Sequence, residues 1–373
     1  MKRILFLMSD TGGGHRAACN AITAALEEKH AGEFEFELVD MWKDYTSYPF
    51  NTMPTTYGKW VNLHPSSYEA QYWIGDRLFK NKLAAKLYER NMYPRIRHLY
   101  QRHPSDIVVC VHSVFVRPSV YALRKLGLQT PFISVITDYA LPTILWYDPR
   151  ADKTLVPVQP AYDRGLELGL DPKKLILTGP VMHPRFSKMN LSQLEARQKL
   201  GWDENAKIVI LVGGGDGMGP LLETAKAIDA SSADSQLVVL AGKNTTLKNA
   251  LEAVSWKKKT TIYGFTDLFD VFLRAADLLI SKAGPATITE AAALGTPMII
   301  NGAIKFQESP NAEYVVAQGA GMYAEGASKV ALALEQVLST PDKLEQLKTG
   351  VKKLADASAV YRIADEIWQS LGV

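Results

Sequence analysis

The chain has 373 residues, of which 47% are hydrophobic, so it can bury sizeable cores, and its length favours two domains. This composition excludes a disordered chain, and a formal net charge of only +3 excludes the chain-wide basic field expected of a nucleic-acid-binding protein. The sequence holds no run of about 18 apolar residues and no signal-peptide pattern, so neither a spanning helix nor export is predicted.

The N-terminal segment predicts a strand, a helix and a second strand. Apolar runs at residues 2–8 and 34–39 are typical of buried strands, and apolar positions recur at helical spacing over residues 15–29. The apolar face of this helix consists of Ala18, Ile22, Ala25 and Leu26. Cys19 in this helix and Cys110 in a later apolar run are predicted to be buried free thiols, as in a reducing cytoplasm.

Short apolar runs continue along the chain at "DIVVCVH", "PFISVITD", "KTLVPV" and "KLILTG". Helical or turn-rich stretches separate them, as in a parallel sheet that helices cover on both faces. The segment "GPVMHPR" interrupts this alternation, which restarts at "KIVILVGGG" and continues through "QLVVLAG", "TTIYGF", "ADLLISKAG" and "PMIIN". We therefore predict an α/β protein with two doubly wound halves, residues 1–185 and 186–358, followed by an amphipathic helix at residues 359–373.

Residues 43–102 form an insert that does not fit this alternation, because it contains no strand-like apolar run. The insert holds 12 of the chain's 35 aromatic residues. Its second part carries basic residues at helical spacing, namely Arg77, Lys80, Lys82, Lys86, Arg90, Arg95, Arg97 and Arg102. Such a segment suits an anionic membrane surface, although local packing of the aromatics and solvation of the charges would explain the same pattern.

Three glycine-containing turns, at residues 12–14, 213–219 and 281–287, follow predicted strands and precede helical segments. Glycine lets the backbone approach a ligand, and a helix N-terminus attracts anions, so these turns favour phosphate binding at the carboxyl ends of the strands. An alternative is a dinucleotide fingerprint, Gly12-x-Gly14-x-x-Ala17, with Asp40 as the ribose-binding acid. The motifs of P-loop nucleotidases, HExxH proteases, G-x-S-x-G hydrolases and Asp-x-Asp transferases are absent from the sequence.

Six segments together resemble a known family: "SDTGGGHRAA", "VITDYALPTILWYDPRADK", "LILTGPVMHPRF", "LVGGGDGMG", "YGFTDLFDVFLRAADLLISKAGPATITEAAALGTPMII" and "QESPNAEYVVAQGAG". Their order is similar to that in the diacylglycerol glycosyltransferases of glycosyltransferase family 28, which include plant-type monogalactosyldiacylglycerol synthases and bacterial processive diacylglycerol glucosyltransferases. The resemblance covers nearly the whole chain. It implies the GT-B fold, in which two Rossmann-like domains face a central cleft and the C-terminal helix crosses back to the N-terminal domain.

In the N-terminal half, the resemblance makes His15 of "GGGHR" the general base. A helix N-terminus disfavours imidazolium and so keeps a proton-accepting nitrogen available at neutral pH, while phosphate binding or helix capping by His15 is the alternative. Asp138 of "VITDY" would orient the base or the acceptor, and His112 would support the acceptor pocket. The turn around His15 would contact substrate through Gly13, Gly14 and Arg16.

In the C-terminal half, the resemblance places Phe265 on the uracil and Glu290 on the ribose. The diphosphate would meet the helix start at Pro285, Ala286 and Thr287, and the glycine turn at Gly214 and Gly215. The hexose would be bound by Gln307, Glu308 and Asn311. A carboxylate beside an amide can hold two sugar hydroxyls, and the wrong epimer would leave one buried group unpaired.

The expected reaction is an inverting transfer of a hexose from UDP-galactose or UDP-glucose to the free hydroxyl of diacylglycerol, without a cofactor or a catalytic metal. The resemblance implies a cytoplasmic enzyme, peripheral on the inner face of the cell membrane, with an anionic membrane surface as partner and no nucleic acid. The sequence has Lys305-Phe306 where relatives usually have Pro-Gly, which leaves the sugar preference open. Alternatives are another lipid-linked transferase, such as the peptidoglycan N-acetylglucosaminyltransferase, and a non-catalytic UDP-sugar sensor.

Overall fold

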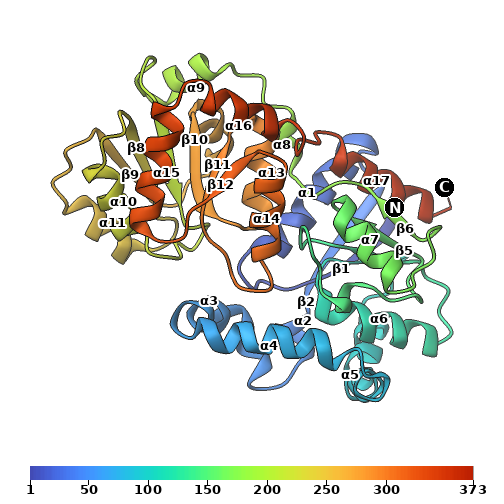
Figure 1. Ribbon diagram of the computed structural model, residues 1–373. Coiled ribbons are helices and arrows are strands. Elements are labelled where there is room, and N and C mark those ends of the chain that lie inside the picture. The colour runs from blue at the N-terminus through green and yellow to red at the C-terminus, as the bar shows by residue number, and fades with distance from the viewer. Residues whose placement is uncertain (373) are drawn as a thin grey trace. The chain divides into compact units, whose positions relative to one another are not determined.

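The computed structural model describes residues 1–372, apart from the side chains of Asn62 and Pro65. Val373, with which the expected C-terminal helix ends, lies outside the described residues. The chain forms two compact units, Met1–Pro184 together with the chain from Ser358 onward, and Arg185–Ala357. Each unit contains one six-stranded parallel sheet (Figure 1). The α/β prediction with two doubly wound sheets is therefore confirmed.

The sheet of the first unit has the strand order β2-β1-β3-β4-β5-β6. Its strands are β1 (Lys2–Met8), β2 (Phe34–Asp40), β3 (Ile107–Cys110), β4 (Phe132–Val135), β5 (Lys153–Val156) and β6 (Leu175–Leu177). The helices that connect them are α1 (Gly14–Lys29), α6 (Ser113–Lys125), η2 (Ile144–Trp146) and α7 (Gln159–Glu167). Strands β3 and β4 bury every side chain because a parallel sheet is covered on both faces. Both cysteines are free and buried, as predicted.

The segment between β2 and β3 is helical. It consists of α2 (Met41–Tyr45), η1 (Phe50–Thr52), α3 (Met53–Leu63), α4 (Pro65–Leu78) and α5 (Lys82–Arg102). Buried Glu89 on α5 accepts hydrogen bonds from Arg117 at 2.8 Å and Arg150 at 2.7 Å, which fixes the inner face of that helix on the unit. The outer faces of α4 and α5 expose five large apolar side chains, Trp73, Ile74, Leu78, Leu83 and Leu87.

The sheet of the second unit has the strand order β12-β11-β10-β7-β8-β9. Its strands are β7 (Ile208–Val212), β8 (Gln236–Leu240), β9 (Thr260–Tyr263), β10 (Leu278–Lys282), β11 (Met298–Gly302) and β12 (Gly321–Tyr323). Its helices are α9 (Gln193–Leu200), α10 (Leu221–Ala230), α11 (Thr245–Glu252), α12 (Phe269–Ala275), α13 (Pro285–Leu294), α14 (Ser309–Ala317), α15 (Ala327–Ser339) and α16 (Lys343–Val351), with α8 (Pro184–Ser187) at the unit boundary. Edge strand β12 was not predicted, because its residues Gly321, Met322 and Tyr323 do not form a continuous apolar run.

The C-terminal helix α17 (Ala359–Ser370) lies beside α1 in the first unit (Figure 1). Its buried face, Val360, Ile363, Ala364 and Ile367, joins the hydrophobic core of that unit. Lys153 Nζ binds the Glu366 carboxylate at 2.6 Å, and Trp368 stacks on His30 with the ring centroids 3.8 Å apart. The end of the chain is thus packed into the first unit. Within the described residues, every helix is too short or too polar to cross a membrane.

Candidate functional site

The turn after β1 places His15 at the carboxyl end of the first sheet. Gly12 and Gly13 have φ values of 71° and 75°, in the left-handed region that favours glycine. Gly13 is the N-cap of α1, so His15 is the second residue of that helix. A Cβ atom on Gly12 would lie 3.3 Å from the ring of Tyr57 on α3, so the helical insert packs directly on this turn.

His15 lies between the ends of two further strands. Its ring centroid is 4.4 Å from that of His112, which follows β3, and its Nδ1 is 3.3 Å from the hydroxyl of Thr137, which follows β4. Burial lowers the pKa of His15 to about 4, against the opposing effects of a ring hydrogen bond to the Val111 carbonyl and of two nearby carboxylates. His15 is therefore neutral at neutral pH and keeps a lone pair that can accept a proton.

His112 is buried and lies at the N-cap of α6. Its ring packs against Phe115 and Trp42, with centroids 5.1 and 6.2 Å away. Burial is the larger and the neighbouring His15 the smaller cause that holds the pKa of His112 well below its ordinary value. Its Nδ1 is buried and has no hydrogen-bond partner among the described residues. The structure thus brings His15 and His112 together as a pair of neutral imidazoles.

The charged residues of this turn are paired with one another. Arg16 on α1 binds both carboxylate oxygens of Asp10, at 2.6 and 2.7 Å, so its charge is compensated within the turn. Asp40 is buried and accepts hydrogen bonds from the backbone N–H groups of Asp10 at 3.1 Å and Lys43 at 3.2 Å. Asp40 is therefore held by the backbone on both sides, at the turn after β1 and at the start of α2.

Asp138, the expected orienting carboxylate, accepts a hydrogen bond from the Trp146 indole at 2.6 Å. Its charge also raises the pKa of Tyr72 on α4, for which burial is the larger cause. The preceding residue, Thr137, places its hydroxyl 3.3 Å from His15 Nδ1. The sequence alone does not distinguish these two neighbours, because both follow the same strand.

The glycine turn after β7 packs backbone against backbone. A Cβ atom on Gly213 would lie 2.1 Å from the Met218 carbonyl oxygen, and one on Gly217 would lie 2.1 Å from that of Ala241. By contrast, a Cβ atom on Gly214 or Gly215 would meet no atom within 4 Å. Close packing therefore requires glycine at positions 213 and 217. Gly214 and Gly215, the two glycines predicted to contact substrate, face open space.

The residues expected to hold a uridine nucleotide lie after β9 and β10. Phe265 is 58% exposed, so its ring offers an aromatic face on which a flat base can stack. The Lys243 ammonium lies 5.3 Å from the ring centroid. Gly284 is the N-cap of α13, whose first turn consists of Pro285, Ala286 and Thr287. The first N–H groups of a helix have no intrahelical partner, so this turn can donate hydrogen bonds to an anion.

Glu290 lies one turn further along α13. Burial raises its pKa to about 8, while Arg185 lowers the pKa and Asp270 raises it further. The carboxyl group is therefore largely protonated at neutral pH. A strongly shifted pKa at the carboxyl end of a parallel sheet is typical of a functional group.

Glu308 and Asn311, two residues expected to bind the hexose, are buried and hydrogen-bonded within the unit. Glu308 pairs with Lys282 of β10 at 2.6 Å and accepts a hydrogen bond from the Ile304 backbone N–H at 3.1 Å. Asn311 donates a hydrogen bond to the Ala283 carbonyl at 3.0 Å, while neighbouring Gln307 is half-buried. Lys282 was not predicted as a site residue. The signal for it in the sequence is a lysine at the end of a buried strand, directly before a glycine turn.

Phe306, which stands where the resemblance led us to expect a glycine, has a left-handed backbone conformation. Its φ is 67°, which is unusual for a bulky residue and costs on the order of 1 kcal/mol or more. Its backbone N–H donates a hydrogen bond to the Ser309 hydroxyl at 3.1 Å, and Lys305 extends its ammonium to within 5.3 Å of the Phe306 ring centroid. The loop before Gln307 thus has, at Phe306, a backbone conformation that favours glycine.

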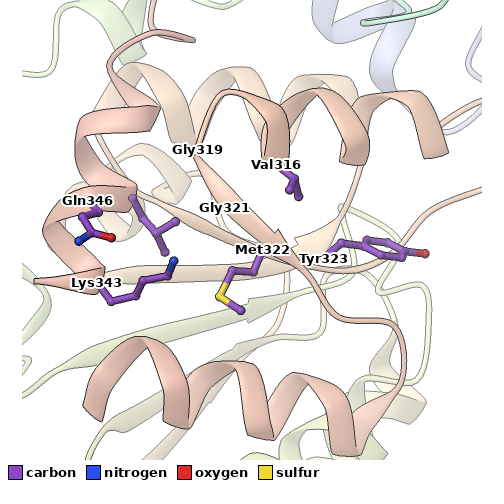
Figure 2. Close-up of a pocket in the computed structure, with 8 residues that line it drawn as sticks. Val316, Gly319, Gly321, Met322, Tyr323, Lys343 and Gln346 are labelled. Carbon is purple, nitrogen blue, oxygen red and sulfur yellow. The ribbon is translucent and has the colours of Figure 1, made fainter. Parts of the chain in front are cut away.

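A separate hollow of about 400 Å³ lies at the edge of the second sheet, between β12, α14 and α16 (Figure 2). Met322 and Tyr323 of β12 and Lys343 and Gln346 of α16 contribute to its lining. The site residues predicted from the sequence do not line this hollow.

Two solved structures match the chain over almost its whole length. The S. aureus MnaA structure with UDP has a TM-score of 0.65 at 14% identity and covers 100% of this chain and 97% of that one. The Acinetobacter baumannii MurG structure has a TM-score of 0.63 at 15% identity and covers 99% and 100%. These matches show the fold alone, and with the two parallel sheets they confirm the predicted GT-B fold.

Sequence comparison gives the family. The model of monogalactosyldiacylglycerol (MGDG) synthase matches residues 15–182, and that of the glycosyltransferase family 28 C-terminal domain matches residues 208–367. Monogalactosyldiacylglycerol synthase 2 of Arabidopsis thaliana, a chloroplastic protein, is 32% identical over 98% of this chain and 80% of its own length. The chain therefore belongs to the monogalactosyldiacylglycerol synthase family of glycosyltransferases, as the resemblance indicated.

The strain at Phe306 predicts the effect of restoring glycine. Replacing Phe306→Gly removes the unfavourable left-handed conformation of a bulky residue, so the free energy of unfolding should rise by about 1 kcal/mol in urea denaturation. Phe50→Gly is the matched control, because Phe50 is also exposed but its φ is not positive. The control should lose stability, and a loss of similar size for Phe306→Gly would contradict the assignment of strain.

Proposed function

We propose that the protein transfers galactose from UDP-galactose to the free hydroxyl of diacylglycerol and so forms monogalactosyldiacylglycerol. The observation that carries this proposal is the similarity to a monogalactosyldiacylglycerol synthase over 98% of the chain. UDP-glucose is the second candidate donor, because Lys305-Phe306 departs from the family pattern beside the predicted hexose element.

His15 is the base of the proposed reaction. The acceptor hydroxyl oxygen attacks the anomeric carbon, the bond from that carbon to the diphosphate oxygen breaks, and its electron pair leaves with UDP. The acceptor proton passes to the neutral His15, and attack from the face opposite UDP inverts the anomeric centre. A pKa of about 4 makes His15 a weaker base than the optimum near neutral pH, and Asp40 and Asp10, which raise that pKa, are placed to stabilise the imidazolium as it forms.

The second unit binds the donor in this proposal. The exposed ring of Phe265 stacks on uracil, the first turn of α13 donates hydrogen bonds to the diphosphate, and Glu290 accepts hydrogen bonds from the ribose hydroxyls. Gln307 and Glu308 bind the hexose. The non-catalytic alternative shares the donor-binding features, but it assigns no role to a neutral histidine pair.

A direct assay tests the function. The purified protein is incubated with diacylglycerol vesicles and radiolabelled UDP-galactose, UDP-glucose or UDP-N-acetylglucosamine, and the lipid product is separated and its anomeric configuration read by NMR. The proposal expects a β-linked monogalactosyl lipid. A product only from UDP-N-acetylglucosamine would favour the alternative transferase, and UDP binding without any lipid product would favour the sensor.

The base assignment predicts a separation of catalysis from donor binding. His15→Ala should lower kcat about 100- to 10,000-fold because it removes general-base help, while the Kd for UDP stays within about twofold. His30→Ala, which removes the ring stacked on Trp368, is the control for changes to α1 and should keep its activity. An equal loss of UDP affinity in His15→Ala would instead identify His15 as a phosphate ligand.

The raised pKa of Glu290 predicts that UDP binding depends on pH. Free Glu290 has a pKa of about 8, and hydrogen bonds from ribose favour its ionised form, so binding at neutral pH should release a proton. UDP affinity should therefore rise from pH about 6 to about 8 and then level off, and Glu290→Gln should remove this slope. Calorimetry in buffers of different ionisation enthalpy measures the released proton, and a pH-independent affinity in the parent protein would refute the assignment.

The same pKa predicts a cost in stability. The folded protein holds the Glu290 proton up to pH about 8, whereas the unfolded chain releases it near 4.5, so the stability falls as pH rises between these values. Glu290→Gln should thus be more stable than the parent at pH about 8, and the difference should vanish near pH 4. Thermal denaturation at both pH values checks the sign.

We also propose that the outer faces of α4 and α5 dock the protein on the inner face of the cell membrane, where its acceptor resides. The exposed Ile74, Leu78, Leu83 and Leu87 supply an apolar ridge beside the basic residues of these helices and of the turn between them. Each lysine or arginine near an anionic leaflet adds on the order of 1 kcal/mol, an attraction that salt screens, whereas insertion of the leucines is insensitive to salt.

If α4 and α5 dock on the membrane, flotation with vesicles that contain phosphatidylglycerol should show two separate losses of binding. Changing Lys80, Lys82 and Lys86 to Glu should abolish binding at low salt, while Leu83→Ser with Leu87→Ser should remove the binding that persists at high salt. Changing the exposed Lys257, Lys259 and Lys352 of the second unit to Glu matches the charge change as a control. If the first triple variant floats as well as this control at every salt concentration, α4 and α5 are not the docking surface.

A further inference from the structure

The pair of Lys282 and Glu308 joins the two loops that the proposed function assigns to the diphosphate and to the hexose. Lys282 ends β10 immediately before the turn into α13, and Glu308 follows the loop after β11. Their side chains meet at 2.6 Å, and a Cβ atom on Gly284, the N-cap of α13, would lie 3.9 Å from both the Glu308 carboxylate and the Lys282 side chain. The ion pair therefore lies against the start of α13.

The two partners differ in accessibility. The Glu308 side chain is 5% exposed and has its second oxygen bound to the Ile304 N–H, whereas the Lys282 side chain is 31% exposed. An ion pair in such a place contributes little net stability, because desolvation of the charges offsets their attraction. A lysine ammonium is a compact charge with three donors on a flexible stem, so it can contact a second anion from the same place. The geometry leaves Lys282 reachable by an anionic ligand and Glu308 shielded behind it.

We propose that Lys282 is a donor-binding residue that Glu308 holds in place until the diphosphate of the sugar nucleotide arrives. The inference rests on the proposed function and deepens it. The diphosphate draws the ammonium of Lys282 away from Glu308, and the released carboxylate oxygen accepts hydrogen bonds from hexose hydroxyls. Because one ammonium serves both anions, binding of the diphosphate and recognition of the sugar are coupled within the second unit.

This coupling predicts opposite effects of removing the two partners. Lys282→Met keeps the length of the side chain but removes the charge that meets the diphosphate, so UDP affinity should fall about 10-fold or more. Glu308→Gln keeps the shape but removes the competing anion, so UDP affinity should stay the same or rise several-fold. The additional affinity of UDP-galactose over UDP should be lost in Glu308→Gln. A pair that merely holds the two loops together predicts that both variants lose UDP affinity.

Calorimetric titration of the protein with UDP and with UDP-galactose tests this. The variants are Lys282→Met, Glu308→Gln and the double variant, with Lys257→Met as the control for loss of an exposed lysine elsewhere in the second unit, and thermal denaturation reports folding. Lys282→Met leaves a buried carboxylate unpaired, so the double variant, which carries no buried charge, supplies the comparison if the single variant does not fold. It should bind UDP about 10-fold more weakly than Glu308→Gln.

The outcomes separate this inference from the proposed function. Weaker UDP binding in Glu308→Gln that matches the loss in Lys282→Met would overturn the inference, and so would a double variant that binds UDP as well as Glu308→Gln. In both cases the parent protein still binds UDP, and the proposed function stands. A parent protein that binds neither UDP nor UDP-galactose would refute the proposed function itself.

Discussion

Parallel pairing of β1 with β3 and of β3 with β4 is the constraint on which the candidate catalytic groups depend. Leu7 pairs with Cys110, and Cys110 pairs with Ser134, so the three strands end at the same edge of the sheet. The residues that follow these ends are brought together although they are distant in sequence: His15 lies 4.4 Å from His112 between ring centroids and 3.3 Å from the Thr137 hydroxyl. Without this pairing, no local feature of the chain would place two imidazoles and a hydroxyl side by side.

Burial of ionisable groups is the second physical theme, and it acts in opposite directions in the two units. It lowers the pKa of His15 to about 4 and raises the pKa of Glu290 to about 8, so both groups are largely uncharged in the free protein at neutral pH. In the proposed function each group gains charge when substrate arrives, His15 by taking a proton and Glu290 by losing one. At pH values between its ordinary and its shifted pKa, each group is neutral in the folded protein but would be charged in the unfolded chain, which lowers the stability of the fold. Such a cost is expected of functional groups rather than of stabilising ones.

The apolar periodicity predicted most strands and the helical insert, because buried parallel strands are continuous apolar runs in the sequence. It did not predict β12, a three-residue edge strand that is defined by its pairing with β11 and not by an apolar run in its own sequence. The sequence motifs identified His15, Glu290 and Glu308 as candidate site residues, but they did not indicate which residues these side chains contact. Contacts of Thr137 with His15 and of Lys282 with Glu308 join residues 122 and 26 positions apart, and only the folded chain brings them together.

Phe306 shows that a bulky side chain occupies a left-handed backbone position in the loop before Gln307. The backbone keeps the left-handed φ of 67° although phenylalanine is disfavoured there, because other contacts determine the loop. The Glu308 N–H donates to the Ile304 carbonyl at 2.7 Å, the Glu308 carboxylate accepts from the Ile304 N–H at 3.1 Å, and the Phe306 N–H donates to the Ser309 hydroxyl. Two of these contacts involve Glu308, which also holds Lys282. The loop's shape therefore depends on the same carboxylate that we assign to the hexose, so a change in sugar preference here is expected to come from the exposed side chains of Lys305 and Phe306 rather than from a different backbone path.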